Sequence, residues 1–314
     1  MAIPFCEDIK VIFMSQIDTS NQVAVIGLGS MGMGVAQSLV SANIPTRGFD
    51  LNTEALKRFA QVGGYAASDL SDAVKDCSIV ILMLVNSNQC DDVLFGEQGM
   101  ADTLAKGAVV VLGSTTSASY ARELNVKLEN MGLKMIDAPV SGGAAKAMTG
   151  ELSIMASGEP AAFDICAQAF EAISTKLYVV GDDVGAGESV KMINQLLAGV
   201  HIASAAEAMA LGIKSGLDPE MIYEIISNSA GSSWMFQNRV PHILEGDYSP
   251  NSMVDIFVKD LGIVLDAGQE MKFPLPIASS AHQQFLSASA AGFGKEDDSA
   301  VIKTYPGVDL PKKK

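Results

Sequence analysis

Residues 23–32 read VAVIGLGSMG, an apolar, strand-like run that passes directly into a Gly-x-Gly-x-x-Gly turn. In a dinucleotide-binding unit the first glycine, Gly27, permits the tight turn, and the second, Gly29, lets a pyrophosphate approach the backbone. The third, Gly32, lets the next helix pack on the strand, so that the phosphates lie at the positive helix N-terminus. Glycine-rich turns are common, and the motif alone is also compatible with a simple turn. Here a helical pattern from Met33 to Ala42 follows it, which favours a dinucleotide site.

Asp50 ends the next apolar run, about twenty residues after the glycines, where such a site requires an acid. Its carboxylate is expected to accept hydrogen bonds from ribose hydroxyls and to repel a 2′-phosphate, which favours NAD over NADP. Arg47 is expected on the opposite face of the strand, and no arginine lies between Leu51 and Lys57, so no phosphate clamp is evident. Asp is also common in turns, and an ordinary strand exit is the alternative.

The chain has 314 residues and a formal net charge of −15. This length suffices for a sizeable core and for two domains. The acidic balance argues against nucleic-acid partners and against anionic membranes, because both need a basic surface. The longest continuous apolar run, Ile79 to Val85, has the length of a strand, so no transmembrane segment is predicted.

The 4 cysteines and 3 histidines show no metal-ligand spacing, so neither a metal site nor a disulfide framework is predicted. A reducing cytoplasm is the plain interpretation. Residues 1–20 are predicted to form an N-terminal extension, which lacks the basic start and apolar block of a signal peptide. Met14 is a candidate natural start, in which case residues 1–13 are an appendage without a catalytic role.

From residue 21 to residue 184, strand-like runs alternate with helical patterns, which predicts an α/β fold with a doubly wound, largely parallel sheet of the Rossmann type. The expected strands are Val23 to Gly27, Thr46 to Asp50, Ile79 to Val85, Val109 to Leu112, Leu133 to Asp137, Ser153 to Ala156 and Leu177 to Val180. Ligands bind such sheets beyond the carboxyl ends of the strands. Loops of interest follow three of the strands there, starting at Asn86, Gly113 and Ala138.

Residues 185–305 change pattern and predict an all-α domain, which a tail at 306–314 follows. The expected helices are Glu188 to Ser215, Pro219 to Asn228, Val254 to Met271 and Pro276 to Ala291, with Pro241 and Pro250 marking turns.

Three polar residues near the start of the long helix, Lys191, Asn194 and Gln195, are spaced to share one helix face. They lie at the junction of the two predicted domains, where binding pockets concentrate. A solvated helix face is the ordinary alternative.

The chain resembles the β-hydroxyacid dehydrogenases, the family of 3-hydroxyisobutyrate dehydrogenase, from Val23 to about Tyr305. Five motifs in the same order carry the resemblance. They are residues 27–32 (GLGSMG), residues 137–143 (DAPVSGG), Gly185-x-Gly187 followed by Lys191, residues 259–261 (KDL), and Gly292-x-Gly294 before Asp297 and Asp298.

The resemblance implies hydride transfer between NAD and a hydroxyl-bearing carbon, with Lys191 as the general base. Lys191 must be neutral for this role, and burial, the positive end of its helix and an oxidised nicotinamide would all disfavour the ammonium. Ser141, Gly142 and Gly143 match the family's substrate-carboxylate loop, in which backbone N–H groups and the serine hydroxyl converge on an anion. An ordinary flexible loop is the alternative there.

The resemblance also implies that Asn194 and Gln195 orient the substrate. Many relatives carry Asn four residues after the lysine, so Gln195 is a departure that leaves open which amide does so. Thr115 and Lys259 match cofactor contacts, although a turn cap and a surface lysine are the ordinary alternatives. The predicted cofactor-binding residues are Gly27, Leu28, Gly29, Ser30, Met31, Gly32, Asp50, Leu51, Val85, Asn86, Thr115 and Lys259.

Within the family, Asp50 and residues 194–201 (NQLLAGVH) are most similar to members that oxidise L-threonate, a four-carbon sugar acid, at its 2-hydroxyl. Alternative substrates are 3-hydroxyisobutyrate, 4-hydroxybutyrate and tartronate semialdehyde. A redox sensor or scaffold that binds dinucleotide without turnover is a different class, and imine-reducing relatives usually replace the lysine that this chain keeps. Asn238 and Arg239 are possible substrate-shaping residues beside Trp234 and Phe236. The resemblance and the Ala-rich helical domain together indicate a homo-oligomer, a dimer or tetramer, whose partner is a small hydroxy acid. The expected location is cytoplasmic, as the cysteine pattern indicates.

Overall fold

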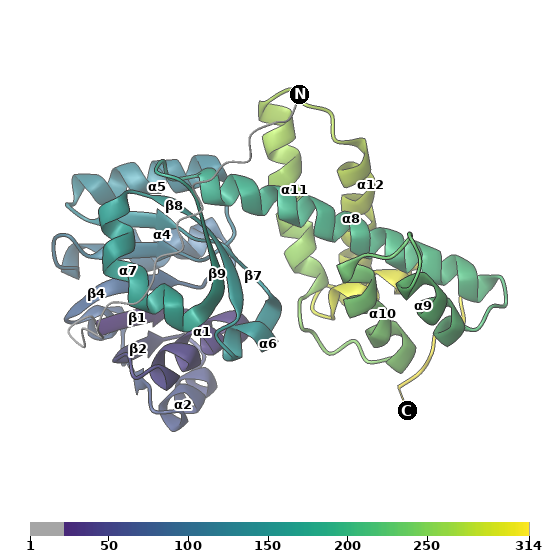
Figure 1. Ribbon diagram of the computed structural model, residues 1–314, viewed down its shortest axis with the longest axis horizontal. Helices are drawn as coiled ribbons and strands as arrows, with labels where there is room; N and C mark the ends of the chain where they lie inside the picture. Colours follow the sequence, from purple (N-terminus) through teal and green to yellow (C-terminus); the bar gives the residue numbers. More distant parts are fainter. Residues whose placement is uncertain (1–21, 314) are drawn as a thin grey trace, which may run out of the picture. The chain divides into compact units, whose positions relative to one another are not determined.

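The computed structural model describes residues 22–313, so the predicted N-terminal extension lies outside the described residues. Within them the chain divides into two compact units, of which the first ends at Lys191 and the second begins at Met192. Figure 1 colours the first unit from purple to teal and the second from green to yellow.

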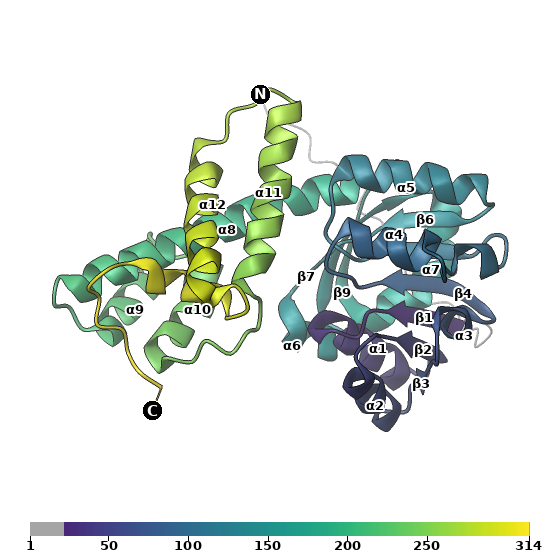
Figure 2. The same ribbon diagram turned by 180° about the vertical axis from the view of Figure 1, so that it is seen from behind.

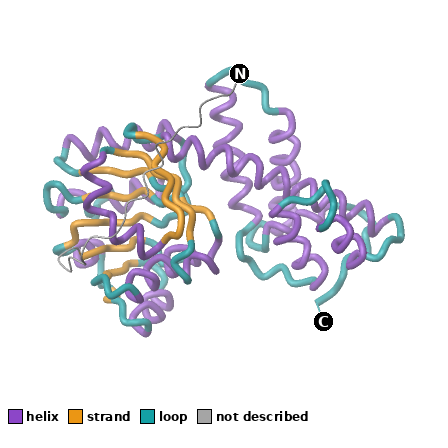
Figure 3. The backbone as a smooth tube through the Cα atoms, in the orientation of Figure 1, coloured by secondary structure: helices purple, strands orange, loops and turns teal. Residues whose placement is uncertain are grey.

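A nine-stranded sheet forms the centre of the first unit and is drawn in orange in Figure 3. Its strands are β1 (Gln22–Ile26), β2 (Thr46–Phe49), β3 (Tyr65–Ala66), β4 (Cys77–Leu82), β5 (Val109–Leu112), β6 (Lys134–Asp137), β7 (Val140–Ser141), β8 (Leu152–Gly158) and β9 (Ser174–Gly181). The strand order is β3-β2-β1-β4-β5-β6-β8-β7, with β9 on β8. Pairing is parallel except where β8 meets β6 and β7. The order reverses between β1 and β4, and open α/β sheets bind ligands beyond the strand ends at such a switch point.

Helices cover both faces of this sheet. They are α1 (Ser30–Ser41), α2 (Thr53–Gln61), α3 (Leu70–Val74), α4 (Ser87–Phe95), α5 (Ala118–Asn130), α6 (Gly143–Met148) and α7 (Pro160–Ile173). One apolar core joins Val23 and Val25 of β1 to α1, α2, α6 and α7. The other joins Ala24 and Ile26 to α3, α4 and α5, which Figure 2 shows from behind. Alternate side chains of β1 thus pack into opposite cores, and this explains the continuous apolar run in the sequence.

The Rossmann-type prediction is confirmed, and all seven predicted strands are present. Val109–Leu112 has the predicted bounds, whereas the strand expected to reach Val85 ends at Leu82. The hydroxyl of Ser114 accepts a hydrogen bond from the backbone N–H of Leu84 there, which draws the chain into a loop. Two strands, β3 and β7, were not predicted, since two residues are too short to show a strand period.

The second unit is helical, as predicted. Its helices are α8 (Ala186–Lys214), which begins in the first unit, α9 (Pro219–Ser227), α10 (Trp234–Glu245), α11 (Val254–Glu270) and α12 (Pro276–Ala288). A short 3₁₀ helix at Asp298–Thr304 follows. Ile202 and Met209 of α8 pack with Val240 of α10 and with Phe257 and Phe285, which stack at 5.2 Å between ring centroids.

The prediction of a turn at Pro241 is wrong, because this proline lies inside α10. A proline cannot donate the helical hydrogen bond to the carbonyl four residues earlier, which here is that of Gln237. The hydroxyl of Tyr223, on α9, donates to that carbonyl oxygen at 3.1 Å. The neighbouring helix thereby satisfies the acceptor that Pro241 leaves open, so α10 continues.

By length and composition alone, α8 is the one helix among residues 22–313 that could cross a membrane. This is weak evidence, since a core helix passes the same test, and 39% of its most apolar window is buried.

Candidate active site

The three glycines of the first loop differ in what their surroundings allow. Gly27 has a φ of +93°, and a Cβ there would lie 2.5 Å from the carbonyl oxygen of Met83. A Cβ on Gly32 would lie 1.9 Å from the carbonyl oxygen of Gly27. Gly29 is exposed, and a Cβ on it would meet nothing within 4 Å. Gly29 also precedes α1, whose N-terminus has no side-chain cap. The loop therefore fits a pyrophosphate, which would approach Gly29 and the uncapped N–H groups of α1.

Asp50 follows β2 and folds back onto this loop. Its Oδ2 accepts the backbone N–H of Leu28 at 2.6 Å, and its Oδ1 accepts that of Asn52 at 2.7 Å. Each carboxylate oxygen keeps further lone pairs for donors such as ribose hydroxyls. Leu51, the next residue, is 91% exposed beside them. The contact to Leu28 thus places the acid and the glycine loop at the same edge of the sheet.

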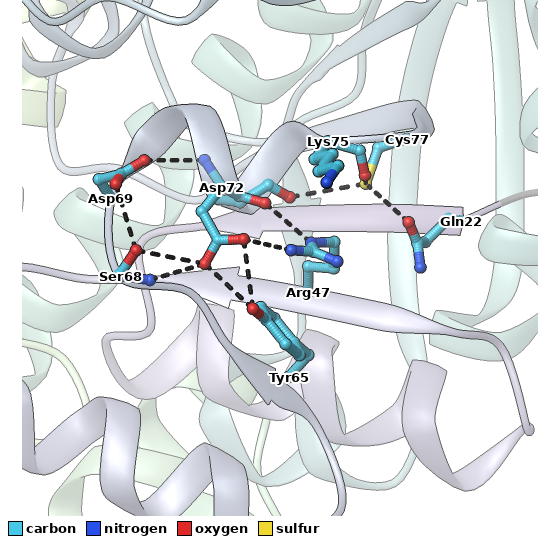
Figure 4. A network of polar contacts seen from close by, with 9 residues as sticks. Gln22, Arg47, Tyr65, Ser68, Asp69, Asp72, Lys75 and Cys77 are labelled. Carbon is cyan, nitrogen blue, oxygen red and sulfur yellow. Dashed lines mark hydrogen bonds and ion pairs between the residues drawn. The ribbon is translucent and has the colours of Figure 1, made fainter.

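Arg47 belongs to a polar cluster that Figure 4 shows in detail. Its Nη2 lies 2.5 Å from Oδ1 of Asp72, and its guanidinium stacks at 3.9 Å on the ring of Tyr65. A hydrogen bond from the Ser68 backbone, together with the Arg47 charge, holds the pKa of Asp72 below its ordinary 3.8. Arg47 is therefore committed to α3 rather than to a phosphate beside Asp50.

Two further loops with predicted cofactor residues are tied to each other. Val85 and Asn86 follow β4, and Asn86 caps α4 by accepting the backbone N–H of Gln89 at 2.9 Å. Thr115 follows β5 in the loop that starts at Gly113. Ser114 of this loop bonds to the backbone N–H of Leu84 at 2.8 Å. The two loops therefore form one rim at the carboxyl ends of β4 and β5.

The predicted carboxylate loop lies between β7 and α6. Gly142 and Gly143 have φ values of +140° and +75°, which only glycine adopts readily. A Cβ on Gly143 would meet nothing within 4 Å. Among the described residues, the Ser141 hydroxyl has no hydrogen-bond partner in the chain. The loop thus offers an open backbone and a hydroxyl.

Helix α6 connects this loop to the dinucleotide loop through α1. The hydroxyl of Ser38, on α1, donates to the carbonyl oxygen of Ala147 at 2.8 Å. A Cβ on Gly34 would lie 2.6 Å from the Cβ of Ala147, so the helices touch through a glycine. The carboxylate loop directly precedes α6, and the dinucleotide loop directly precedes α1. The contact between these two helices therefore connects the two loops.

Lys191 is buried, with 6% of its surface exposed, and its Nζ donates to the carbonyl oxygen of Val140 at 2.9 Å. Val140 directly precedes Ser141. The predicted base and the predicted carboxylate loop are thus brought together within the first unit.

The first turn of α8 is capped by two buried side chains, Asp137 and Ser157. Oδ2 of Asp137 accepts the backbone N–H groups of Gly185 and Glu188 at 3.0 and 2.9 Å. The Ser157 hydroxyl oxygen accepts those of Ala186 and Gly187 at 3.1 and 3.2 Å, and it donates to Oδ1 of Asp137. Burial raises the pKa of Asp137, although these hydrogen bonds oppose the shift.

Glu188 adds a tie to the β5 loop, because its Oε1 accepts both the backbone N–H and the hydroxyl of Thr116 at 2.9 Å. Sequence reasoning missed the capping pair and this tie. Asp137 was visible as the acid that ends a predicted strand, but its partners lie 20 to 51 residues away in sequence.

Asn194, Gln195 and Lys259 meet in the second unit around a fourth residue, Asp260. Nε2 of Gln195 donates to Oδ2 of Asp260 at 2.5 Å, and Nδ2 of Asn194 donates to Oε1 of Gln195 at 2.9 Å. Nζ of Lys259 lies 2.9 Å from Oδ1 of Asp260. The three predicted residues therefore belong to one network whose centre is a buried carboxylate that was not predicted.

The structure gives Arg239 a different partner from the substrate suggested by sequence. Its Nε lies 2.5 Å from Oδ1 of Asp298, which is fully buried, and it also contacts the Asn238 side chain. Phe236 is buried and stacks on Tyr223, whereas Trp234 is 60% exposed. Arg239 is thus held in a buried ion pair of the helical unit.

A glycine loop before a helix, an acid at the end of the next strand and a buried lysine beside a second glycine loop are typical of one class, the dehydrogenases that use a nicotinamide dinucleotide. A model for the NAD-binding domain of 6-phosphogluconate dehydrogenase matches residues 22–181. A model for the NAD-binding domain of NADP-dependent 3-hydroxyisobutyrate dehydrogenase matches residues 185–305. The chain belongs to the β-hydroxyacid dehydrogenase family of 3-hydroxyisobutyrate dehydrogenase and is an NAD-dependent hydroxyacid oxidoreductase.

Individual relatives cover almost the whole chain. An L-threonate dehydrogenase from Cupriavidus necator is 52% identical over 94% of this chain and 99% of its own length. The mitochondrial 3-hydroxyisobutyrate dehydrogenase of Rattus norvegicus is 32% identical over 90% of this chain and 86% of its own. The crystal structure of a 3-hydroxyisobutyrate dehydrogenase from Salmonella typhimurium superposes with a TM-score of 0.87 at 46% identity, covering 91% of this chain and 100% of that one.

Proposed function

We propose that this protein oxidises L-threonate at its 2-hydroxyl to the 2-oxo acid, with NAD as the hydride acceptor and Lys191 as the general base. The observation that carries the proposal is the 2.9 Å hydrogen bond from Lys191 Nζ to the Val140 carbonyl oxygen. It fixes a buried amine beside the loop that is suited to a carboxylate. L-Threonate dehydrogenases at 48% to 52% identity support this substrate.

Ser141, Gly142 and Gly143 bind the substrate carboxylate, and the hydroxyl that reacts then lies toward Lys191. The neutral amine can donate one N–H to Val140 and still offer its lone pair to the substrate hydroxyl. It takes the hydroxyl proton as the carbon–hydrogen bond of the same carbon breaks. When bound, NAD supplies the acceptor for that hydride. In the reverse direction the ammonium of Lys191 returns the proton to the carbonyl oxygen.

The cofactor is held along the edge that the glycine loop and Asp50 define, with the pyrophosphate against Gly29, Ser30, Met31 and the start of α1. Asp50 accepts from the ribose hydroxyls and disfavours a 2′-phosphate. Leu51 offers an exposed apolar surface for the adenine. Val85, Asn86 and Thr115 line the rim further along, and Lys259 is a further cofactor contact.

The test is a set of initial rates for purified protein with NAD and with NADP across L-threonate, 3-hydroxyisobutyrate, 4-hydroxybutyrate and tartronate semialdehyde. The proposal requires the highest kcat/KM for L-threonate with NAD. A higher value for 3-hydroxyisobutyrate would instead favour the activity of the Salmonella and rat relatives.

We further propose a cytoplasmic homo-oligomer, a dimer or tetramer, that associates through the helical unit. Large apolar side chains are exposed there, including Leu211, Phe273 and Ile277 at 62% to 68%. The described cysteines Cys77, Cys90 and Cys166 are buried and form no disulfide among the described residues, as in a reducing compartment. Light scattering after size-exclusion chromatography tests the oligomer, since a monomeric mass at micromolar concentration would contradict it.

A further inference from the structure

We propose that Asp260 is a positioning residue that sets the orientation of the Gln195 and Asn194 carboxamides, so that Asn194 presents its amide oxygen to a substrate hydroxyl beyond the one that reacts. This inference rests on the proposed function and deepens it. The acceptor on Asn194 would explain why the enzyme prefers acids with several hydroxyl groups over acids that carry alkyl groups at the same carbons.

The orientation of Gln195 follows from the chemistry of its partner. A carboxylate only accepts hydrogen bonds, whereas a carboxamide has one accepting and one donating end. Gln195 is 8% exposed and Asp260 is 2% exposed, and they lie 2.5 Å apart. The NH₂ group of Gln195 must therefore face Asp260. The opposite arrangement would place two buried acceptors against each other.

The orientation passes on to Asn194. With its NH₂ group toward Asp260, Gln195 presents Oε1, which accepts a hydrogen bond from Nδ2 of Asn194 at 2.9 Å. The amide oxygen of Asn194 then points away from Gln195. It has no hydrogen-bond partner among the described residues, and the Asn194 side chain is partly exposed. An acceptor held in this way pairs with a hydroxyl and is left unpaired by a methyl group.

Close packing of α8 on α11 makes the contact between Gln195 and Asp260 possible. Gly199 follows Gln195 by one turn of α8, and a Cβ there would lie 3.0 Å from both δ-carbons of Leu261. It would also lie 3.0 Å from Cδ1 of Phe257. The helices therefore approach as closely as a glycine allows. Nζ of Lys259 lies 2.9 Å from the second oxygen of Asp260, so the charge of the carboxylate is balanced, although that oxygen accepts no hydrogen bond.

Steady-state kinetics at saturating NAD test the selectivity. Asp260→Asn lets the Gln195 amide rotate, and we expect KM for L-threonate to rise about tenfold, the value of one hydrogen bond. The comparison substrate is 2-hydroxybutanoate, which keeps the carbon chain and the 2-hydroxyl but lacks the other two hydroxyls. Its kcat/KM, or its inhibition constant if turnover is slow, should change less than about twofold, since it makes no such bond. Asp266→Asn, the same change at an exposed site of α11, is the control.

A double variant separates positioning from a structural role. The double variant Gln195→Glu with Asp260→Asn exchanges the positions of the carboxylate and the carboxamide. The carboxylate at position 195 then accepts hydrogen bonds from the amide at position 260 and from Nδ2 of Asn194. Asn194 is then oriented as in the unmodified protein, and KM for L-threonate should return to within about threefold. Equal losses for both substrates in Asp260→Asn, or a double variant no better than the single one, would overturn the proposal.

Side-chain amide NMR provides a readout that needs no substrate. The Gln195 NH₂ signals, assigned by their loss in Gln195→Glu, should exchange slowly with water and exchange at least tenfold faster in Asp260→Asn. Unchanged exchange would refute the positioning role. If the unmodified protein does not oxidise L-threonate, the proposed function fails, whereas amide exchange still decides whether Asp260 orients Gln195.

Discussion

The backbone nitrogen of Glu188 lies 2.9 Å from Oδ2 of Asp137, although 51 residues separate the two in the sequence. Asp137 ends β6, and Glu188 lies in the first turn of α8, one turn before Lys191. A strand end therefore determines where the helix begins. Since Lys191 lies so close to that start, the cap also determines where its amine is held.

Asp137→Asn tests this arrangement. All four groups around the carboxylate are donors, namely the N–H and hydroxyl of Ser157 and the N–H groups of Gly185 and Glu188. An asparagine would turn its own NH₂ toward one pair of them. We expect the free energy of unfolding to fall by about 3 kcal/mol, as for a lost hydrogen bond to a buried charged group. Urea titration measures it, and a loss below about 0.5 kcal/mol, the scale of surface substitutions, would contradict the capping role.

Lys191→Ala should lower kcat by at least about a hundredfold, the scale of general acid–base catalysis. Lys191→Arg should be nearly as inactive, because arginine stays protonated and cannot accept the hydroxyl proton. NAD affinity, measured by fluorescence, and the urea midpoint serve as controls and should stay near normal. An arginine variant that keeps more than about a tenth of the rate would make Lys191 an electrostatic anchor rather than a base.

Ser141→Ala should raise KM for L-threonate about five- to tenfold, because it removes one donor to the carboxylate. Affinity for NAD should not change, and Ser204→Ala, on an exposed face of α8, is the matched control. An equal loss of NAD affinity would assign the loop to the cofactor. Gly142 is a poorer position for this test, because a Cβ there would lie 3.0 Å from Lys146 at a φ of +140°.

Local patterns in the sequence predict most of the fold. The glycine loop and the buried runs of β1, β4 and β5 each show the feature that forms them, an alternating or continuous apolar run with turn residues at its ends. Helix α10 was missed because the hydroxyl of Tyr223, far from Pro241 in sequence, satisfies the carbonyl that a proline normally leaves open. No local pattern contains that information.

The same division applies to the candidate site. Lys191, Asn194 and Gln195 could be singled out because helical spacing places them together. The sequence does not reveal which end of each carboxamide donates and which accepts, because this depends on Asp260 of another helix. Likewise, Arg239 is charged and near aromatic residues in the sequence, but only the fold reveals its pairing with Asp298.

Asp50→Ala should weaken NAD binding and narrow the preference over NADP. It removes the acceptor for the ribose hydroxyls and the charge that repels a 2′-phosphate. It also frees the backbone N–H of Leu28, to which Asp50 bonds at 2.6 Å. Dissociation constants for the two cofactors measure the change. Equal use of NAD and NADP by the unmodified protein would show that Asp50 does not select the cofactor.

Arg239→Ala should destabilise the protein in a pH-dependent manner, because its partner Asp298 is fully buried. Burial raises the pKa of Asp298 from 3.8 to about 6, even though the Arg239 charge opposes the shift. A raised carboxyl pKa means that folding favours the protonated form. The stability from this group is thus fully present below about pH 4 and is lost as the pH rises through about 6.

Without Arg239 the Asp298 carboxylate loses its ion-pair partner and keeps only the weaker help of a hydrogen bond from Ser252, so the loss of stability becomes larger at neutral pH. Removing one partner of a buried ion pair costs about 3–5 kcal/mol, and we expect a penalty of about this size at pH 7.5. At pH 4.5 Asp298 is protonated in both proteins, so the penalty should be smaller. Urea titrations at the two pH values measure it, with Arg58→Ala, at an exposed site of α2, as the control. An equal penalty at both pH values would mean that Arg239 contributes through packing rather than through its charge.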